Sequence, residues 1–185
     1  MEYMEDRTLE LMTKYLDGDY RVSPMAPHKS TLQDIKNVEN ELDINFPDEY
    51  IAHLLGENDE ALGSRGIYIE VKEEFWERPK AYDAAPFWSF LYGFHTYTAC
   101  KESTDWMRLN FVGKNFFAET GIKVVPILKI IGNRDLYCVN EKREIVKYNH
   151  DENAIENTNM NFWEVFEFEL KELKERKELK LKQYI

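Results

Sequence analysis

The sequence predicts an α+β fold with N-terminal helices, a central, mostly antiparallel sheet and a C-terminal helix. Apolar residues recur at helical spacing near both ends of the chain, and short strand-like segments separated by turn residues lie between them. Strands and helices do not alternate regularly, which argues against a doubly wound parallel sheet. The 185 residues, 43% of them hydrophobic, suffice for one domain with a substantial core.

Residues 1–29 are expected to form an accessory N-terminal helix and a linker. The helix is expected at residues 3–16, where apolar residues recur every three or four positions. Its apolar face is predicted to contain Leu9, Met12 and Leu16. Prolines interrupt residues 19–29, which are predicted to be irregular. The main domain is expected at residues 30–173, and a charged helical extension at residues 174–185.

Residues 30–55 carry the strongest local pattern, two amphipathic helices joined by a short elbow. Ser30 is predicted to cap the first helix, Pro47 suits the first position of the second, and Gly56 suits its end. His53 is expected on the surface or rim of the second helix. The apolar faces are predicted to consist of Leu32, Ile35, Val38, Leu42, Tyr50, Ile51, Leu54 and Leu55.

The remaining elements are strands, one internal helix and a final helix. Strands are expected at residues 67–71, 96–99, 124–131, 136–140 and 144–148. A helix is expected at residues 101–118, with Trp106, Leu109 and Phe117 facing inward. Asn161 and Glu164 have the spacing of a capping box for the final helix. The apolar face of that helix is predicted to contain Phe162, Val165, Phe166, Leu170 and Leu173.

Several short motifs occur in order between residues 30 and 166. In the two-helix unit they comprise Ile35, Glu39, Leu42, Ile44, Phe46, Pro47, Tyr50 and Leu54. Further along they comprise Val-Pro-Ile at 125–127, Gly-Asn-x-Asp-x-Tyr at 132–137 and Asn-Phe-Trp-Glu-x-Phe at 161–166. Together they resemble the SUKH superfamily, which groups bacterial immunity proteins with fungal Smi/Knr-type cell-wall assembly regulators. The resemblance implies a domain that acts by binding another protein.

Charge is distributed unevenly along the chain, whose net charge is −11. Residues 1–77 carry a net charge of −12, and residues 151–169 contain six acids and no base. An acidic surface repels phosphate, so direct nucleic-acid binding is disfavoured, whereas capture of a basic protein is favoured. Acidity that serves only solubility is the alternative, and the sequence leaves both open.

Location and redox state follow from the same composition. No apolar run is long enough to span a bilayer, and the acidic start differs from a secretory signal. We therefore expect a cytoplasmic protein without membrane association. Cys100 and Cys138 have neither disulfide-framework nor zinc-site spacing and are expected to be buried free thiols.

Motifs of catalysis are not found in the sequence. The four histidines lack metal-ligand spacing, and no glycine-rich phosphate loop or nucleophile elbow occurs. The expectation is therefore a protein that is not an enzyme and holds no cofactor or metal. A hydrolase whose carboxylates cannot be recognised from sequence remains an alternative without positive support.

A cluster of acids with embedded aromatic residues is the candidate partner-binding surface. Its members are Glu57, Asp59, Glu60, Glu70, Glu73, Glu74, Trp76, Glu77, Tyr82 and Trp88. Aromatic side chains supply buried contact area at interfaces, and carboxylates attract a basic partner. The alternative is that Trp76 and Trp88 belong to the core and the acids form a solvated rim.

Taken with the resemblance, these features predict an immunity protein that occludes a cognate, nuclease-type bacterial toxin. The toxin's site would be basic, and the acidic surface would cover it without turnover. The alternative is a regulatory scaffold or adaptor in cell-wall or stress signalling. The identity of the partner and the oligomeric state stay open.

Overall fold

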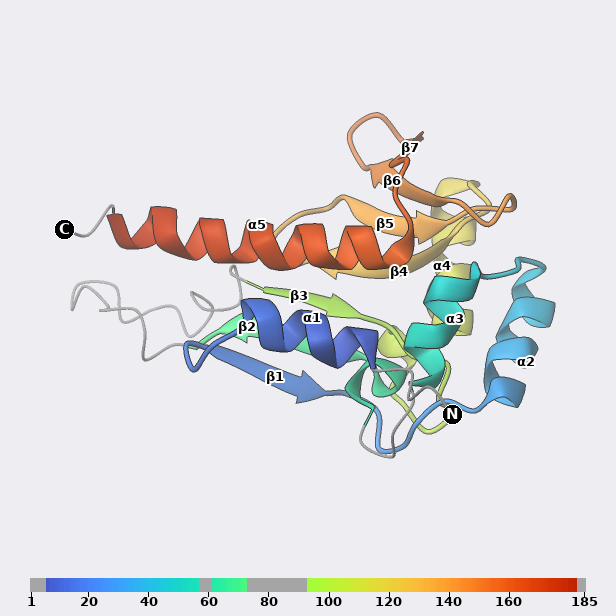
Figure 1. Ribbon diagram of the computed structural model, residues 1–185. Coiled ribbons are helices and arrows are strands. Elements are labelled where there is room, and N and C mark those ends of the chain that lie inside the picture. Colours follow the sequence, from blue (N-terminus) through green and yellow to red (C-terminus); the bar gives the residue numbers. More distant parts are fainter. Residues whose placement is uncertain (1–5, 57–60, 73–92, 183–185) are drawn as a thin grey trace.

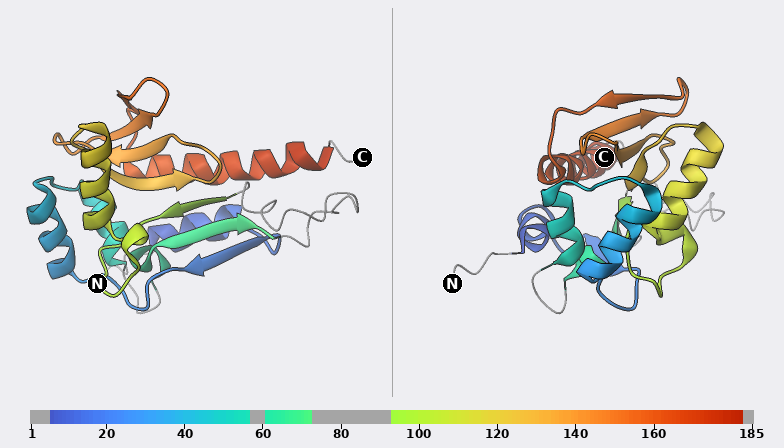
Figure 2. Two further views of the ribbon diagram at one scale, coloured as in Figure 1. Left: turned by 180° about the vertical axis from the view of Figure 1, so that it is seen from behind. Right: turned by 90° about the vertical axis from the view of Figure 1, so that its right-hand side faces the viewer.

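The computed structural model describes residues 6–56, 61–72 and 93–182, which form a seven-stranded sheet with helices on both faces (Figures 1 and 2). The helices are α1 (Arg7–Tyr15), α2 (Leu32–Leu42), α3 (Asp48–Leu55), α4 (Leu109–Thr120) and α5 (Phe162–Lys182), with short 3-10 helices η1 (Leu62–Arg65) and η4 (Asp105–Met107). The strands are β1 (Tyr20–Pro24), β2 (Ile67–Val71), β3 (Gly93–Thr96), β4 (Val125–Ile130), β5 (Leu136–Val139), β6 (Ile145–Asn149) and β7 (Ala154–Asn157). The predicted α+β class is confirmed.

The strands lie in the sheet in chain order, and each is antiparallel to its neighbours. The predicted positions of β2, β4, β5 and β6 are confirmed within one or two residues. The linker prediction was wrong at β1, because Tyr20–Pro24 pair residue by residue with β2. Proline is tolerated there because β1 is an edge strand and Pro24 is its last residue.

Two further strands differ from expectation. The strand expected at residues 96–99 is β3, which lies at Gly93–Thr96 and pairs with both β2 and β4. No strand was predicted at β7, whose residues Ala154–Asn157 are all exposed and pair with β6. A polar strand of this kind lacks the β-branched alternation by which strands are recognised.

The two faces of the sheet are covered by different helices. Helices α1, α3 and α5 lie on one face and α4 on the other, as the end-on view shows (Figure 2). On the first face the rings of Phe94 and Phe166 meet edge to face with centroids 5.8 Å apart. On the second, Phe116 of α4 meets Tyr148 of β6 edge to face at 4.8 Å. Side chains therefore alternate between two packed layers, as the pleat requires.

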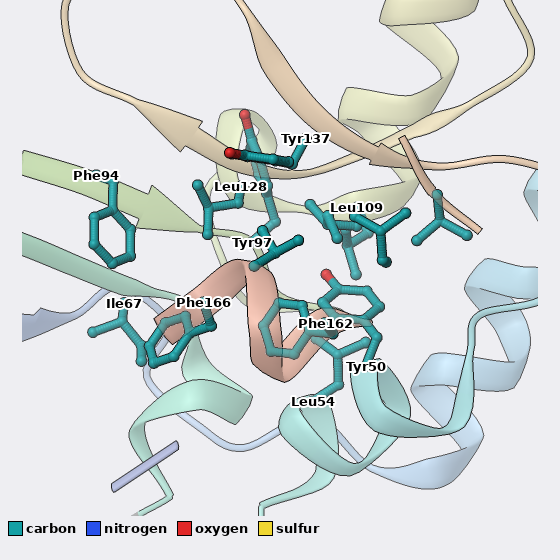
Figure 3. Packing of buried hydrophobic residues seen from close by; sticks show 14 of the residues in the cluster. Tyr50, Leu54, Ile67, Phe94, Tyr97, Leu109, Leu128, Tyr137, Phe162 and Phe166 are labelled. Carbon is teal, nitrogen blue, oxygen red and sulfur yellow. The ribbon is translucent and has the colours of Figure 1, made fainter. Parts of the chain in front are cut away.

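The main core forms between the sheet and α5 (Figure 3). All five residues predicted for the apolar face of α5 are fully buried. Phe162 packs against Tyr50 of α3, with centroids 5.1 Å apart. The capping box is also confirmed, since the backbone N–H groups of Asn161 and Glu164 each donate to the other residue's side chain. The helix extends through Lys182, but Lys177 is buried and its Nζ lies 3.0 Å from Oδ2 of Asp19, so this region is not wholly solvated.

Both helices of the two-helix unit form as predicted, but the residues that cap their starts differ from expectation. Thr31 rather than Ser30 caps α2, and it forms a capping box with Asp34. Pro47 precedes α3 as its N-terminal cap, and Gly56 ends the helix with φ +57°. Ser30 is instead buried in a polar network described below.

Four residues predicted to face inward are about half exposed, and for them the prediction was wrong: Leu9, Leu32, Trp106 and Phe117. In α1 the buried face is rotated toward Thr8, Leu11 and Met12, which lie on the side of α5. The helix predicted to start at residue 101 begins at Leu109, after the 3-10 turn that carries Trp106.

Candidate protein-binding groove

A groove of about 310 Å³ lies between the end of α2, the middle of α4 and the start of β4. We call it the α2–α4 groove, and its lining residues are Glu41, Leu42, Ile44, Gly113, Lys114, Phe117, Lys123, Val124 and Val125. Most of these are apolar, and the ionisable ones lie in exposed or half-buried positions. The groove therefore combines an apolar floor with a charged rim.

The floor depends on a close approach of two helices at Gly113. A Cβ atom at this position would lie only 2.8 Å from Cδ1 of Leu42, so glycine permits α2 and α4 to meet. Leu42 ends α2 and Ile44 follows in the elbow, whereas Gly113 lies far along the chain. The sequence identifies these residues as apolar or small, but their meeting is a consequence of the tertiary fold.

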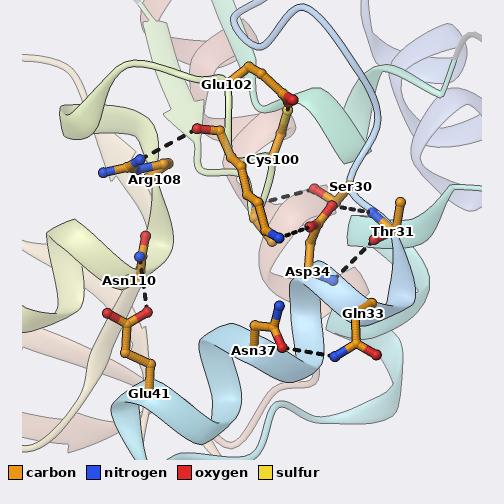
Figure 4. A network of polar contacts seen from close by, with 12 residues as sticks. Ser30, Thr31, Gln33, Asp34, Asn37, Glu41, Cys100, Glu102, Arg108 and Asn110 are labelled. Carbon is orange, nitrogen blue, oxygen red and sulfur yellow. Dashed lines mark hydrogen bonds and ion pairs between the residues drawn. The ribbon is translucent and has the colours of Figure 1, made fainter.

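Polar contacts hold α2 beside α4 and the chain that precedes it (Figure 4). Nδ2 of Asn110 donates to Oε2 of Glu41 over 3.1 Å, joining the two helices directly. At the start of α2, Oγ of Ser30 lies 3.1 Å from Oγ1 of Thr98 and donates to the carbonyl of Ser64. These three side chains are buried, so unmade hydrogen bonds among them would be costly. The Asn110–Glu41 bond lies at the groove, and the buried network anchors the opposite end of α2.

Ion pairs form the rim of the groove. Lys114 pairs with Glu41, and the hydrogen bond from Lys114 lowers the pKa of that carboxyl group. Nζ of Lys123 lies 2.9 Å from Asp43 and 3.2 Å from Glu141, and it lowers the pKa of Asp43 in the same way. Both lysines of the lining, Lys114 and Lys123, are therefore paired with carboxylates, of which Glu41 lines the groove itself and Asp43 and Glu141 lie beside it.

Phe117 stands at the mouth of the groove with 52% of its surface exposed. It lies one turn after Gly113 on α4, so its ring borders the floor at the point of closest helix approach. Exposed aromatic rings beside a concave apolar surface are typical anchors of protein interfaces, because they bury a large area with little loss of conformational entropy. The arrangement can therefore hold an apolar side chain of a partner.

The prediction that His53 lies on a helix surface was wrong. The side chain is 1% exposed, and its ring packs 4.5 Å from that of Phe162. Nδ1 of His53 lies 2.7 Å from Oγ1 of Thr8, while Nε2 is buried without a hydrogen-bond partner among the described residues. Burial lowers the pKa of His53 to about 3, because removal from water disfavours the charged imidazolium. The histidine joins α3 to α1 rather than facing the groove.

A second buried polar contact joins α5 to the sheet. The hydroxyl of Tyr137 donates to Oε1 of Glu169 over 2.7 Å, and Glu169 is only 2% exposed. Burial raises the pKa of both groups. Cys100 and Cys138 are buried free thiols, as predicted. None of these groups lines the α2–α4 groove.

One of the ten residues predicted to bind a partner lies within the described part of the chain. Glu70 is in β2, is 6% exposed, and accepts a hydrogen bond of 3.2 Å from Arg21. The others lie outside the described residues: Glu57, Asp59, Glu60, Glu73, Glu74, Trp76, Glu77, Tyr82 and Trp88. The groove was not predicted from the sequence. Two features could have indicated it: Gly113 within a helical pattern, and Phe117, whose ring was assigned to the core.

In comparisons with known proteins, no family model, curated protein or solved structure matches this chain. In the described part of the chain, no three His, Cys, Asp or Glu side chains are grouped so that they could hold a metal ion. Within the same residues, no helix has the length and apolarity needed to cross a membrane.

Proposed function

We propose that this chain is a SUKH-like, non-catalytic protein-binding domain, an immunity protein that neutralises a cognate nuclease-type bacterial toxin in the cytoplasm by covering its active site. The proposal is supported by the order of motifs from the two-helix elbow to α5, which the SUKH resemblance rests on. It is also supported by the net charge of −11. Nuclease sites are basic because they bind phosphate, and the same positive potential attracts an acidic protein.

The observation that carries the proposal is the α2–α4 groove. Its apolar floor and exposed Phe117 supply contact area, and Glu41, Asp43 and Glu141 place carboxylates at or beside its rim, each paired with a lysine. Interfaces with basic enzymes combine such an apolar centre with carboxylates that steer encounter. Inhibition would then be stoichiometric, since the domain occupies the site without changing it.

The test is co-expression with the toxin domain encoded by the neighbouring gene, followed by titration of its nuclease activity. The proposal expects rescue of growth and co-purification. It also expects nuclease activity to fall as this protein is added and to be fully lost at one equivalent. A regulatory scaffold, the alternative implied by the same resemblance, would co-purify with a partner but leave the partner's activity intact. Absence of both rescue and co-purification would contradict the immunity function.

A matched pair of variants tests the groove itself. Phe117→Ala removes the exposed ring at the groove, whereas Phe168→Ala removes a comparably exposed ring from α5 on the opposite side of the sheet. Loss of an aromatic anchor typically costs about 2 kcal/mol, or about thirtyfold in affinity. Phe117→Ala should weaken toxin binding by that amount and Phe168→Ala should not. Equal effects would remove the groove from the interface.

A further inference from the structure

The two edges of the sheet differ in how they are protected. On β1, Arg21 and the terminal Pro24 discourage further pairing, and the adjoining turn is tied to α5 by Asp19 and Lys177. On β7 no lysine, arginine or proline occurs, and all four residues are exposed. Among the described strands β7 has β6 as its single neighbour, and the β6–β7 hairpin projects from the body of the molecule (Figure 1). The β1 edge therefore carries a proline and an arginine that oppose further strand pairing. The β7 edge carries neither, and we call it the open edge.

The register shows which backbone groups of β7 face outward. The N–H of Thr158 donates to the carbonyl of Ile145 over 3.2 Å, next to the pair Val146–Asn157. Hydrogen-bonded pairs alternate along an antiparallel ladder, so residues 154 and 156 also point their backbone groups at β6. The N–H and C=O groups of Ile155 and Asn157 therefore point away from the sheet. They form a two-residue unit with which another strand can pair.

The side chains of β7 give this edge two chemically distinct faces. Ile155 lies beside Tyr148 and continues an apolar row that passes from Leu136 through Tyr148, and 41% of its surface is exposed. Glu156 points to the other face, opposite Lys147, whose ammonium lies over the ring of Tyr137. The one large apolar side chain and the one carboxylate of β7 therefore point to opposite faces of the open edge.

The charge around this edge is negative. Asp151 and Glu152 occupy the turn before β7 and Glu156 lies within the strand, against one basic residue, Lys147, in the facing part of β6. His150, which begins the turn, lies 3.6 Å from Asp151. A segment that approaches this edge is therefore favoured when it carries basic residues.

We propose that β7 accepts an extended segment of a basic protein partner as an eighth strand of the sheet. The segment places an apolar side chain beside Ile155 and lysine or arginine side chains beside Glu156. Main-chain hydrogen bonds to Ile155 and Asn157 supply affinity, and the alternating side chains supply specificity. This inference rests on the proposed protein-binding function and adds a second contact to the groove.

A proline substitution tests the edge without breaking the sheet. Because the N–H of Ile155 points outward, Ile155→Pro removes that donor and blocks the edge but leaves the bonds between β6 and β7 intact. Ile155→Thr is the matched control, since it keeps the N–H and a β-branched side chain. With the toxin domain of the neighbouring gene as the probe, Ile155→Pro should weaken binding about tenfold or more and Ile155→Thr by about threefold or less.

Amide hydrogen exchange of the wild-type complex gives a readout that needs no variant. The amides of Ile155 and Asn157 should exchange rapidly in the free protein and become protected when the partner binds. If the toxin domain binds but these amides stay unprotected, or if Ile155→Pro binds as tightly as the wild type, the edge proposal is wrong while the proposed function stands. If the wild type does not bind at all, both are wrong. A homodimer that Ile155→Pro dissociates would identify a second copy as the occupant and overturn the proposal.

Discussion

Acid should destabilise this protein through two buried histidines. Burial lowers the pKa of His53 to about 3 and that of His95 to about 4, whereas each titrates near 6.5 in an unfolded chain. Both are neutral at pH 7 in the folded state and mostly neutral in the unfolded state. As the pH falls below 6.5, these histidines bind protons in the unfolded chain but not in the folded chain. The free energy of unfolding therefore falls until the pH reaches the pKa of each histidine in the folded state.

The size of the effect follows from these pKa values. Between pH 7 and pH 5 each histidine removes about 2 kcal/mol from the free energy of unfolding, and the two together remove about 4 kcal/mol. Glu169 opposes this loss, because its raised pKa favours proton uptake by the folded state. The contribution of one histidine is therefore measured as a difference between wild type and variant. The pH window also lies above the range in which Glu41 and Asp43 lose their charge.

The variant is His53→Gln, which cannot titrate but keeps a polar partner for Thr8. Urea unfolding at pH 7 and pH 5 gives the free energies by linear extrapolation. The loss between the two values should be about 2 kcal/mol smaller in His53→Gln than in wild type, whatever the variant's stability at pH 7. His28→Gln, at an exposed histidine, should show the wild-type loss. An unchanged pH dependence in His53→Gln would refute the assignment of a buried, neutral imidazole.

Two further predictions concern α5 and the groove. Tyr137→Phe removes the hydroxyl that donates to Glu169 and should cost about 2 kcal/mol in urea unfolding at pH 7, but only about 1 kcal/mol when Glu169→Gln has made the acceptor neutral; equal costs would contradict a charge-assisted bond. Gly113→Ala gains about 1 kcal/mol of helix propensity, which offsets the cost of displacing the Leu42 side chain, so the thermal stability should change little. The displaced Leu42 side chain enters the groove, so toxin binding should weaken. Unaltered binding by this folded variant would exclude the floor of the groove from the interface.

Elements with strong periodicity could be predicted from the sequence, and those defined by their neighbours could not. The apolar face of α5 and the strands β4 to β6 bury one or both sides, so their hydrophobic pattern is fixed by the core. β1 carries Pro24 and lies at the sheet edge, and β7 is polar throughout. Neither needs a buried pattern to pair, because the hydrogen bonds come from the strand beside it.

The candidate site was less accessible to sequence reasoning than the fold. His53 was assigned to the surface because its type is polar, but the ring of Phe162 and the hydroxyl of Thr8 accommodate it in the core. Phe117 was assigned to the core because its type is apolar, but α4 buries Phe116 instead. A shift of one residue along a helix exchanges buried and exposed side chains. Which of two neighbouring residues is buried depends on the surface of the same molecule against which the helix packs.

Helix α4, which borders the groove, and Ile155 of the open edge lie on the same side of the sheet, and this follows from how the helices divide its faces. α4 packs onto β6 through Phe116 and Tyr148, and Tyr148 in turn lies beside Ile155 of β7. The groove is formed along α4 itself, one turn of which carries Gly113 and Phe117. The long helix α5 packs on the other face of the sheet, so it does not separate α4 from the β7 edge. A partner surface with one apolar anchor and one basic extended segment matches both features at once.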